Sequence, residues 1–186
     1  KLFDENADLD PSDIPLLIMV TQTPDYRIPH SSAVLQDALG MSTAVACFDI
    51  NLGCSGYVYA LSVAKGMMAS QEYQNALVVT CDPYSKIMGK SDRNTSPLFG
   101  DGASANWLSA EKGASIGLCD FGTDGQGASD LMISSGGAAN PTSSYYASCL
   151  NEADESEFRL NMNGRAIFEF AAMRVPVSIE KCLKAN

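Results

Sequence analysis

The sequence predicts an α/β fold whose parallel strands are covered by helices on both faces. Three largely apolar stretches of strand length occur at residues 16–20, 45–50 and 76–80. Two helical patterns separate these runs, and the links between them are short. Strands that alternate with helices in this way usually pair in parallel through right-handed crossovers.

The first part of the chain contains a polar segment, a strand and a helix. Residues 1–13 are acidic and polar, and we expect them to form a surface lead-in. Residues 16–20 are an unbroken apolar run, which is typical of a strand buried on both faces. Ser31 or Ser32 is expected to cap the following helix, which should end at Gly40.

The middle of the chain repeats the alternation of strand and helix. The strand at 45–50 leads through a turn at 51–56 into a helix at 57–69. This helix is apolar on almost every face, so we expect it to be buried all round. The strand at 76–80 follows.

The last part of the chain is less regular. Two further strands are expected at 103–110 and 115–121, followed by a loop rich in Gly, Ser and Asn at 122–157. A final helix should begin near Met162 and run towards the last residue. Pro176 is expected to bend or interrupt it, because proline lacks the N–H that a helix interior needs.

The composition of the 186 residues bounds the class of protein. Hydrophobic residues make up 46% and charged residues only 18%, which favours a packed core and excludes a disordered chain. The formal net charge of −10 argues against binding to nucleic acid or to an anionic membrane. The sequence lacks an apolar run of about 18 residues and an apolar leader. We therefore expect a soluble, cytoplasmic protein.

The six cysteines do not form a Cys-x-x-Cys motif, which disfavours zinc-ribbon and thioredoxin-type sites. We expect all six to be reduced thiols, most of them buried, and we expect no metal. They stand at positions 47, 54, 81, 119, 149 and 182.

Cys54 is the strongest candidate for chemistry. It follows a predicted strand, precedes a predicted helix and is flanked by Gly53 and Gly56, so a sharp turn could lift its side chain off the sheet. A helix N-terminus favours the thiolate, and its N–H groups could stabilise the oxyanion formed from an acyl thioester. The alternative is a tight turn that holds a buried cysteine.

His30 is the only histidine of the chain. It stands in a proline-flanked loop before a helix, so we expect a surface or capping residue. If Cys54 requires a histidine base, that base is expected to lie outside this chain.

From about Leu16 onward, the order of motifs resembles the β-ketoacyl-acyl-carrier-protein synthase III family, within the thiolase-like condensing enzymes. The segments that carry the resemblance are residues 48–61, 76–80, 92–95, 99–103 and 161–165.

The resemblance implies a thiolase-like layered α-β-α-β-α fold, of which this chain is an incomplete part. Residues 1–150 would form most of the N-terminal half, and residues 151–186 would begin the C-terminal half. The family's catalytic His and Asn match no residues here. A fragment of this kind is expected to be acylated at most and not to complete a condensation.

The resemblance also implies an activity. Cys54 matches the nucleophile that takes an acyl group from a coenzyme A thioester and then condenses it with malonyl-acyl-carrier protein. The product would be a 3-ketoacyl chain in fatty acid or related biosynthesis, made by a homodimer. The alternatives are a related enzyme of secondary metabolism, such as a polyketide synthase or acyltransferase, and a non-catalytic subunit of the same fold.

Further positions match binding residues of the family. Arg93 matches a contact to the adenine end of coenzyme A. Phe99 and Met162 match positions that line the acyl tunnel. Gly164 and Arg165 lie where a loop meets the pantetheine arm.

Ile28 falls where the family often places an aromatic residue that reaches across the dimer interface. An aliphatic side chain at this position could leave room for a longer or branched primer.

Overall fold

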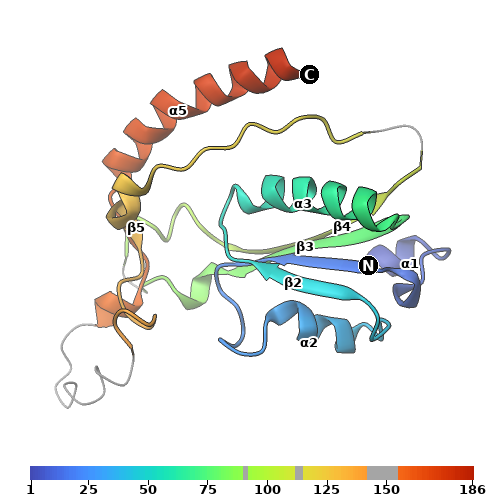
Figure 1. Ribbon diagram of the computed structural model, residues 1–186. Coiled ribbons are helices and arrows are strands. Elements are labelled where there is room, and N and C mark those ends of the chain that lie inside the picture. The colour runs from blue at the N-terminus through green and yellow to red at the C-terminus, as the bar shows by residue number, and fades with distance from the viewer. Residues whose placement is uncertain (90–91, 112–114, 142–154) are drawn as a thin grey trace. The chain divides into compact units, whose positions relative to one another are not determined.

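The computed structural model divides into two compact units, which we describe one at a time (Figure 1). It describes residues 1–89, 92–111, 115–141 and 155–186. The boundary expected near residue 150 lies outside these ranges and stays a prediction.

The first unit, Lys1–Asp82 with Asp101–Cys119, is built on a four-stranded sheet. Its strands, in the spatial order β2-β1-β3-β4, are β2 (Ala46–Ile50), β1 (Leu16–Val20), β3 (Asn75–Pro83) and β4 (Asp101–Ser109). β1 pairs in parallel with both neighbours, so that Leu17 lies opposite Cys47 on one side and Leu77 on the other. The predicted parallel core of the sheet is confirmed.

β4 runs in the opposite direction to β3. The N–H of Ala110 donates to the carbonyl of Gln74 at 2.8 Å. The Thr80 and Ser104 hydroxyl oxygens lie 2.9 Å apart. Residue numbers therefore rise along one strand as they fall along the other. The strand expected at 103–110 is confirmed.

Helices α3 (Gly56–Gln71) and α2 (Ser31–Ala38) cover opposite faces of the sheet (Figure 1). Successive β1 side chains point to opposite faces. Those facing α3 join a cluster of Leu16, Ile18, Val20, Ala60, Ala64, Ala76 and Val78. Those facing α2 join a second cluster of Leu9, Ile14, Leu17, Met41 and Leu77. The prediction of a strand buried on both faces is confirmed.

The N-terminal segment is the predicted surface lead-in for most of its residues, which are exposed, but some of its apolar side chains pack into the core. It contains the short helix α1 (Leu2–Glu5), and Leu2 and Phe3 pack against the second cluster. Leu9 and Ile14 are buried within that cluster. These four apolar residues are spaced irregularly among acidic ones, so the periodicity of the sequence does not predict their burial.

α3 is buried along one stripe only, contrary to the prediction of burial all round. Gly56, Ala60 and Ala64, four residues apart, face the sheet, and their small size allows the helix to approach it closely. Val58 and Val63 are 42% and 37% exposed on other faces. The apolar composition of α3 therefore predicted more burial than this helix has among the described residues.

The second unit, Pro83–Gly100 with Asp120–Asn186, is less regular. Its elements are the 3-10 turns at Tyr84–Lys86, Gly125–Asp130 and Glu155–Phe158, the short strands β5 (Leu131–Met132) and β6 (Asn161–Met162), and helix α5 (Gly164–Ala185). β5 and β6 pair antiparallel, with Leu131 opposite Met162.

α5 continues through Pro176 as one helix, so the predicted interruption is wrong. A proline removes one hydrogen bond from the ladder, whereas the turns on either side keep theirs. Among the described residues, no helix is both long enough and apolar enough to cross a membrane.

The strand predicted at 115–121 is not formed. An extended segment becomes a strand only when a neighbouring strand supplies its backbone partners. The carbonyl of Ile116 instead accepts a hydrogen bond from the Lys65 ammonium group at 2.5 Å.

Candidate active site

Cys54 lies in the turn between β2, which ends at Ile50, and α3, which begins at Gly56. The N–H of Gly56 donates to the carbonyl of Gly53 at 2.8 Å and closes this turn around the thiol. Ser55 is the N-cap of α3, and its side chain makes no capping hydrogen bond. The thiol therefore stands at a helix start whose first N–H groups have no partner within the helix.

Close contacts surround both glycines of the turn, and at Gly56 they come from packed side chains that cannot easily move, whereas at Gly53 they come from the end of the exposed Gln22 side chain. A Cβ at Gly53 would lie 2.6 Å from Oε1 of Gln22, inside van der Waals contact. A Cβ at Gly56 would lie 2.5 Å from Cγ1 of Val20 and 3.0 Å from Cβ of Leu52. The sequence prediction of a turn that depends on small residues is thus supported by geometry.

Cys54 is exposed, which contradicts the alternative of a buried cysteine in a tight turn. Cys47, Cys81, Cys119 and Cys182 are not in disulfides and are half-buried, so the prediction that most cysteines are buried is wrong for the described ones. Cys149 lies outside the described residues.

His30 occupies the N-cap position of α2 and is exposed, as predicted. Its Nε2 lies 3.8 Å from the sulfur of Cys47. The start of α2 is held instead by Asp49, whose two carboxylate oxygens accept from the N–H groups of Ser31 and Ser32 at 2.7 and 2.8 Å.

Asp82 is a residue of this region that sequence reasoning missed. Its Oδ1 accepts from the Thr21 hydroxyl at 2.9 Å and from the Gln22 N–H at 2.8 Å. It also accepts from the Thr23 hydroxyl at 2.8 Å and the Thr23 N–H at 3.1 Å. Their positions in the sequence could have predicted this contact. Thr21 and Asp82 lie at the ends of two strands that were predicted to be parallel, and such ends meet at one edge of a sheet.

Ile28 lies in the loop between β1 and α2, and its side chain is 88% exposed. Together with Cys54 it belongs to the first unit. The other five predicted site residues belong to the second unit.

In the second unit, Arg93 stands exposed in a loop that Asp92 organises. The Asp92 carboxylate accepts hydrogen bonds from the Thr95 hydroxyl and from the N–H groups of Asn94 and Thr95. The Thr95 hydroxyl, followed by the Asn94 N–H, holds the pKa of Asp92 below its usual value. Thr95 is fully buried, so the loop is anchored two residues after Arg93.

Phe99 and Met162 are half-buried, which suits residues that line an apolar channel. The ring of Phe99 stacks on that of Tyr84, with centroids 5.1 Å apart and planes 22° apart. Met162 lies in β6, two residues before Gly164, which is the first residue of α5.

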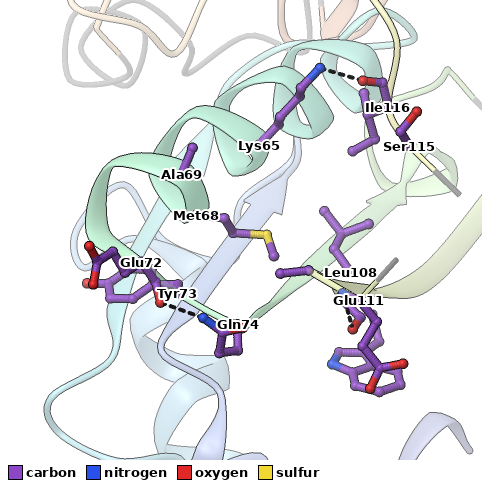
Figure 2. A pocket seen from close by; sticks show the side chains of 13 residues that line it. Lys65, Met68, Ala69, Glu72, Tyr73, Gln74, Leu108, Glu111, Ser115 and Ile116 are labelled. Carbon is purple, nitrogen blue, oxygen red and sulfur yellow. Dashed lines mark hydrogen bonds between the residues drawn. The ribbon is translucent and has the colours of Figure 1, made fainter. Parts of the chain in front are cut away.

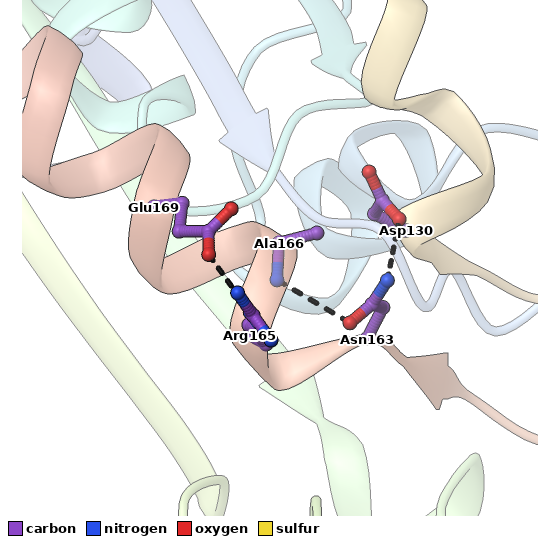
Figure 3. Close-up of polar contacts among 5 residues, drawn as sticks. All are labelled: Asp130, Asn163, Arg165, Ala166 and Glu169. Carbon is purple, nitrogen blue, oxygen red and sulfur yellow. Dashed lines mark hydrogen bonds and ion pairs between the residues drawn. The ribbon is translucent and has the colours of Figure 1, made fainter.

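Figure 3 shows how the start of α5 is fixed. Asn163 accepts from the N–H of Ala166 at 3.3 Å and donates through its amide to the Asp130 carboxylate at 3.1 Å. Arg165 points away from this cap and pairs with Glu169 at 2.8 Å, and its side chain is 88% exposed. The guanidinium of Arg165 thus lies at the surface of the helix, where its Nε is paired with Glu169.

A hollow of about 1060 Å³ lies between the C-terminal half of α3 and β4 (Figure 2). Lys65, Met68, Tyr73, Trp107, Leu108 and Glu111 are among the residues that line it. None of the seven predicted site residues lines this hollow, which adjoins the end of α3 remote from Cys54. Within the described ranges, no cluster of three His, Cys, Asp or Glu side chains could hold a metal ion.

The family model for 3-oxoacyl-[acyl-carrier-protein] synthase III matches residues 48–125, which include Cys54 and Arg93. The β-ketoacyl-[acyl-carrier-protein] synthase III of Clostridium beijerinckii is 36% identical over 184 residues, which are 99% of this chain and 54% of the relative. The enzyme of the same name from Caldanaerobacter subterraneus is 36% identical over 90% of the chain and 49% of its own length. The chain is therefore similar to the 3-oxoacyl-[acyl-carrier-protein] synthase III enzymes over about half of their length.

Solved structures agree with this similarity. A crystal structure of a 3-oxoacyl-(acyl-carrier-protein) synthase III shares 38% identity with a TM-score of 0.88, over 98% of this chain and 56% of that one. The 3-oxoacyl-(acyl-carrier protein) synthase of Burkholderia xenovorans shares 34% identity with a TM-score of 0.81, over 98% and 51%. The predicted thiolase-type α/β fold is confirmed. The chain spans about half the length of the curated relatives it matches.

Proposed function

We propose that the protein is a condensing acyltransferase that works through a Cys54 acyl-enzyme. It joins the acyl group of an acyl-coenzyme A primer to malonyl-acyl-carrier protein and makes a 3-ketoacyl product in fatty acid or related biosynthesis. The observation that carries this proposal is the exposed thiol of Cys54, in a glycine turn at the start of α3, inside the segment that matches the synthase III family.

In the first step, the Cys54 thiolate attacks the thioester carbonyl, and N–H groups at the start of α3 stabilise the oxyanion. Collapse of the tetrahedral intermediate expels the coenzyme A thiolate and leaves the acyl group on sulfur. In the second step, malonyl-acyl-carrier protein loses carbon dioxide, and the resulting carbanion attacks the acyl carbonyl and releases the Cys54 thiolate. The resemblance assigns the decarboxylation to a His and an Asn that match no residues of this chain.

The binding roles follow the positions described above. Arg93 contacts the adenine end of coenzyme A, while Phe99 and Met162 line the acyl tunnel. Gly164 and Arg165 meet the pantetheine arm. Coenzyme A thioester is a substrate, and the mechanism requires no resident cofactor or metal.

The cellular setting follows from the same proposal. The protein acts in the cytoplasm as a homodimer, with acyl-carrier protein as its partner and without nucleic acid or membrane. Ile28 reaches the acyl site of the second copy.

A second candidate function is priming in secondary metabolism. A priming β-ketosynthase from the R1128 polyketide pathway shares 30% identity with a TM-score of 0.76, over 92% of this chain and 48% of that one. This similarity supports the same acylation of Cys54 by an acyl-coenzyme A, followed by condensation with a different acceptor. A non-catalytic subunit is disfavoured because the cysteine is present and exposed.

The test is a condensation assay with the intact native protein. With an acyl-coenzyme A and malonyl-acyl-carrier protein, we expect release of carbon dioxide together with formation of 3-ketoacyl-acyl-carrier protein. Both products should be lost in Cys54→Ser. The control Cys182→Ser, far along the chain in α5, should keep the activity. Acylation without condensation would favour the secondary-metabolism candidate and call for other carrier-bound acceptors.

A further inference from the structure

The segment that follows β1 touches the Cys54 turn at successive residues. The N–H of Thr21 donates to the carbonyl of Ile50 at 3.2 Å, where β2 gives way to the turn. The carboxamide of Gln22 lies against Gly53, the residue before the nucleophile, within 2.6 Å of the place that a Cβ would occupy. Residues 21 and 22 therefore form one wall of the turn that carries the thiol.

Asp82 holds this wall in place. Four donors from residues 21–23 converge on its Oδ1 at 2.8 to 3.1 Å, and two of them are backbone N–H groups. Thr21 is buried, with 2% of its surface exposed, so this network is part of the packed structure. An ionised oxygen forms stronger hydrogen bonds than a neutral one.

A second contact fixes the other side of the turn independently of Asp82. The side chain of Val20 packs beneath Gly56 in the apolar cluster under α3. Loss of the carboxylate would therefore release residues 21–23 and the wall beside Gly53, while the packing below α3 would remain.

We propose that Asp82 is a positioning residue for Cys54. From the end of β3 it fixes residues 21–23, and Gln22 in turn sets the position of Gly53 and of the thiol that follows it. The proposal rests on the proposed function, because its effect is measured at the acylated cysteine.

The experiment measures single-turnover acylation of Cys54 by acyl-coenzyme A in the intact native protein and in two variants, Asp82→Asn and Gln22→Ala. Asp82→Asn removes the charge with almost no change in size. Gln22→Ala removes the wall but keeps the backbone N–H that Asp82 binds. Asp10→Asn is the matched control, because Asp10 binds the N–H and hydroxyl of Ser12 in a surface turn of the same unit.

We expect the acylation rate at saturating acyl-coenzyme A to fall about tenfold or more in both variants, since misplacement by about 1 Å can cost two orders of magnitude. The burst amplitude, which counts folded sites, and the half-saturating concentration should stay within about twofold of the wild type. Asp10→Asn should match the wild type throughout.

A purely structural role would give a different pattern, in which the amplitude and the melting temperature fall while the rate per folded site is kept. That result, or an unchanged rate in Gln22→Ala, would overturn the positioning role. If the wild-type Cys54 is not acylated at all, the proposed function itself fails, and the two failures are thereby told apart.

Discussion

Ile28 offers a test of primer selection at the scale of one side chain. It is 88% exposed in its loop, so Ile28→Phe should change the free energy of unfolding by no more than about 0.5 kcal/mol. In the proposed function Ile28 reaches the acyl site, and a phenyl ring would fill more of that site than an isoleucine, so we expect acyl-chain profiling to shift towards shorter, unbranched primers. Ile28→Val should keep the wild-type profile. An unchanged profile in Ile28→Phe would remove this residue from the acyl site.

Asp92 gives the Arg93 loop a dependence on pH. Hydrogen bonds from Thr95 and Asn94 lower the pKa of its carboxyl group in the folded state. The stabilisation is therefore present above the pKa of the unfolded chain and is lost as the pH falls through the lower folded value. We expect the Asn94 and Thr95 amide signals in NMR spectra to shift together in this acidic range. Asp92→Asn should abolish the shared transition, and its persistence would mean that another group titrates.

At the scale of elements, α3 contains a matched pair of glycines. Gly56 faces Val20 and Leu52 at distances that leave no space for a methyl group, whereas Gly66 has open space around it. Gly56→Ala should destabilise the fold by about 1–3 kcal/mol through overpacking. Gly66→Ala should stabilise it by about 0.5–1 kcal/mol through helix propensity. Urea unfolding measures both, and equal effects would contradict the close packing of the Cys54 turn.

The elements of the first unit were largely predictable, because β1 is an unbroken apolar run and β2 and β3 have largely apolar centres, with helical patterns between these strands. β1 was predicted with its observed limits, and β2, α2 and α3 differ from prediction by a few residues at most. The failures have physical causes. The segment at 115–121 has the residue types of a strand. It would form a strand only if a neighbouring strand supplied backbone hydrogen bonds, and composition alone does not predict such a neighbour.

The candidate site was predictable only where one residue carries the chemistry. Cys54 could be found from Gly53 and Gly56. Small residues between a predicted strand and a predicted helix indicate a tight turn, and the thiol lies within that turn. Asp82 was missed because its donors lie about 60 residues earlier in the chain, and the only signal in the sequence was that two strands predicted to be parallel end near these residues. The contacts of Arg93 and Phe99 with a ligand were inferred from resemblance and stay predictions.

At the scale of the whole chain, the net charge of −10 carried by the 186 residues bears on the carrier-protein partner of the proposed function. An acidic surface repels an acidic carrier protein over distances of about a Debye length, roughly 8 Å at physiological ionic strength. In the proposed function, docking of acyl-carrier protein would therefore depend on a local group of basic side chains. The proposed acyl transfer from coenzyme A to Cys54 would precede that docking and would not require it.

The most direct test of the account is peptide-mapping mass spectrometry after incubation with a panel of acyl-coenzyme A thioesters. It compares this chain, the intact native protein and the Cys54→Ser variant of the intact protein. We predict an acyl group on the peptide that contains Cys54 in the intact protein and none in the variant. The length of the acyl chain that is transferred best would then indicate which biosynthetic pathway the protein serves. A folded intact protein that stays unlabelled at Cys54 would contradict the account and favour a non-catalytic subunit.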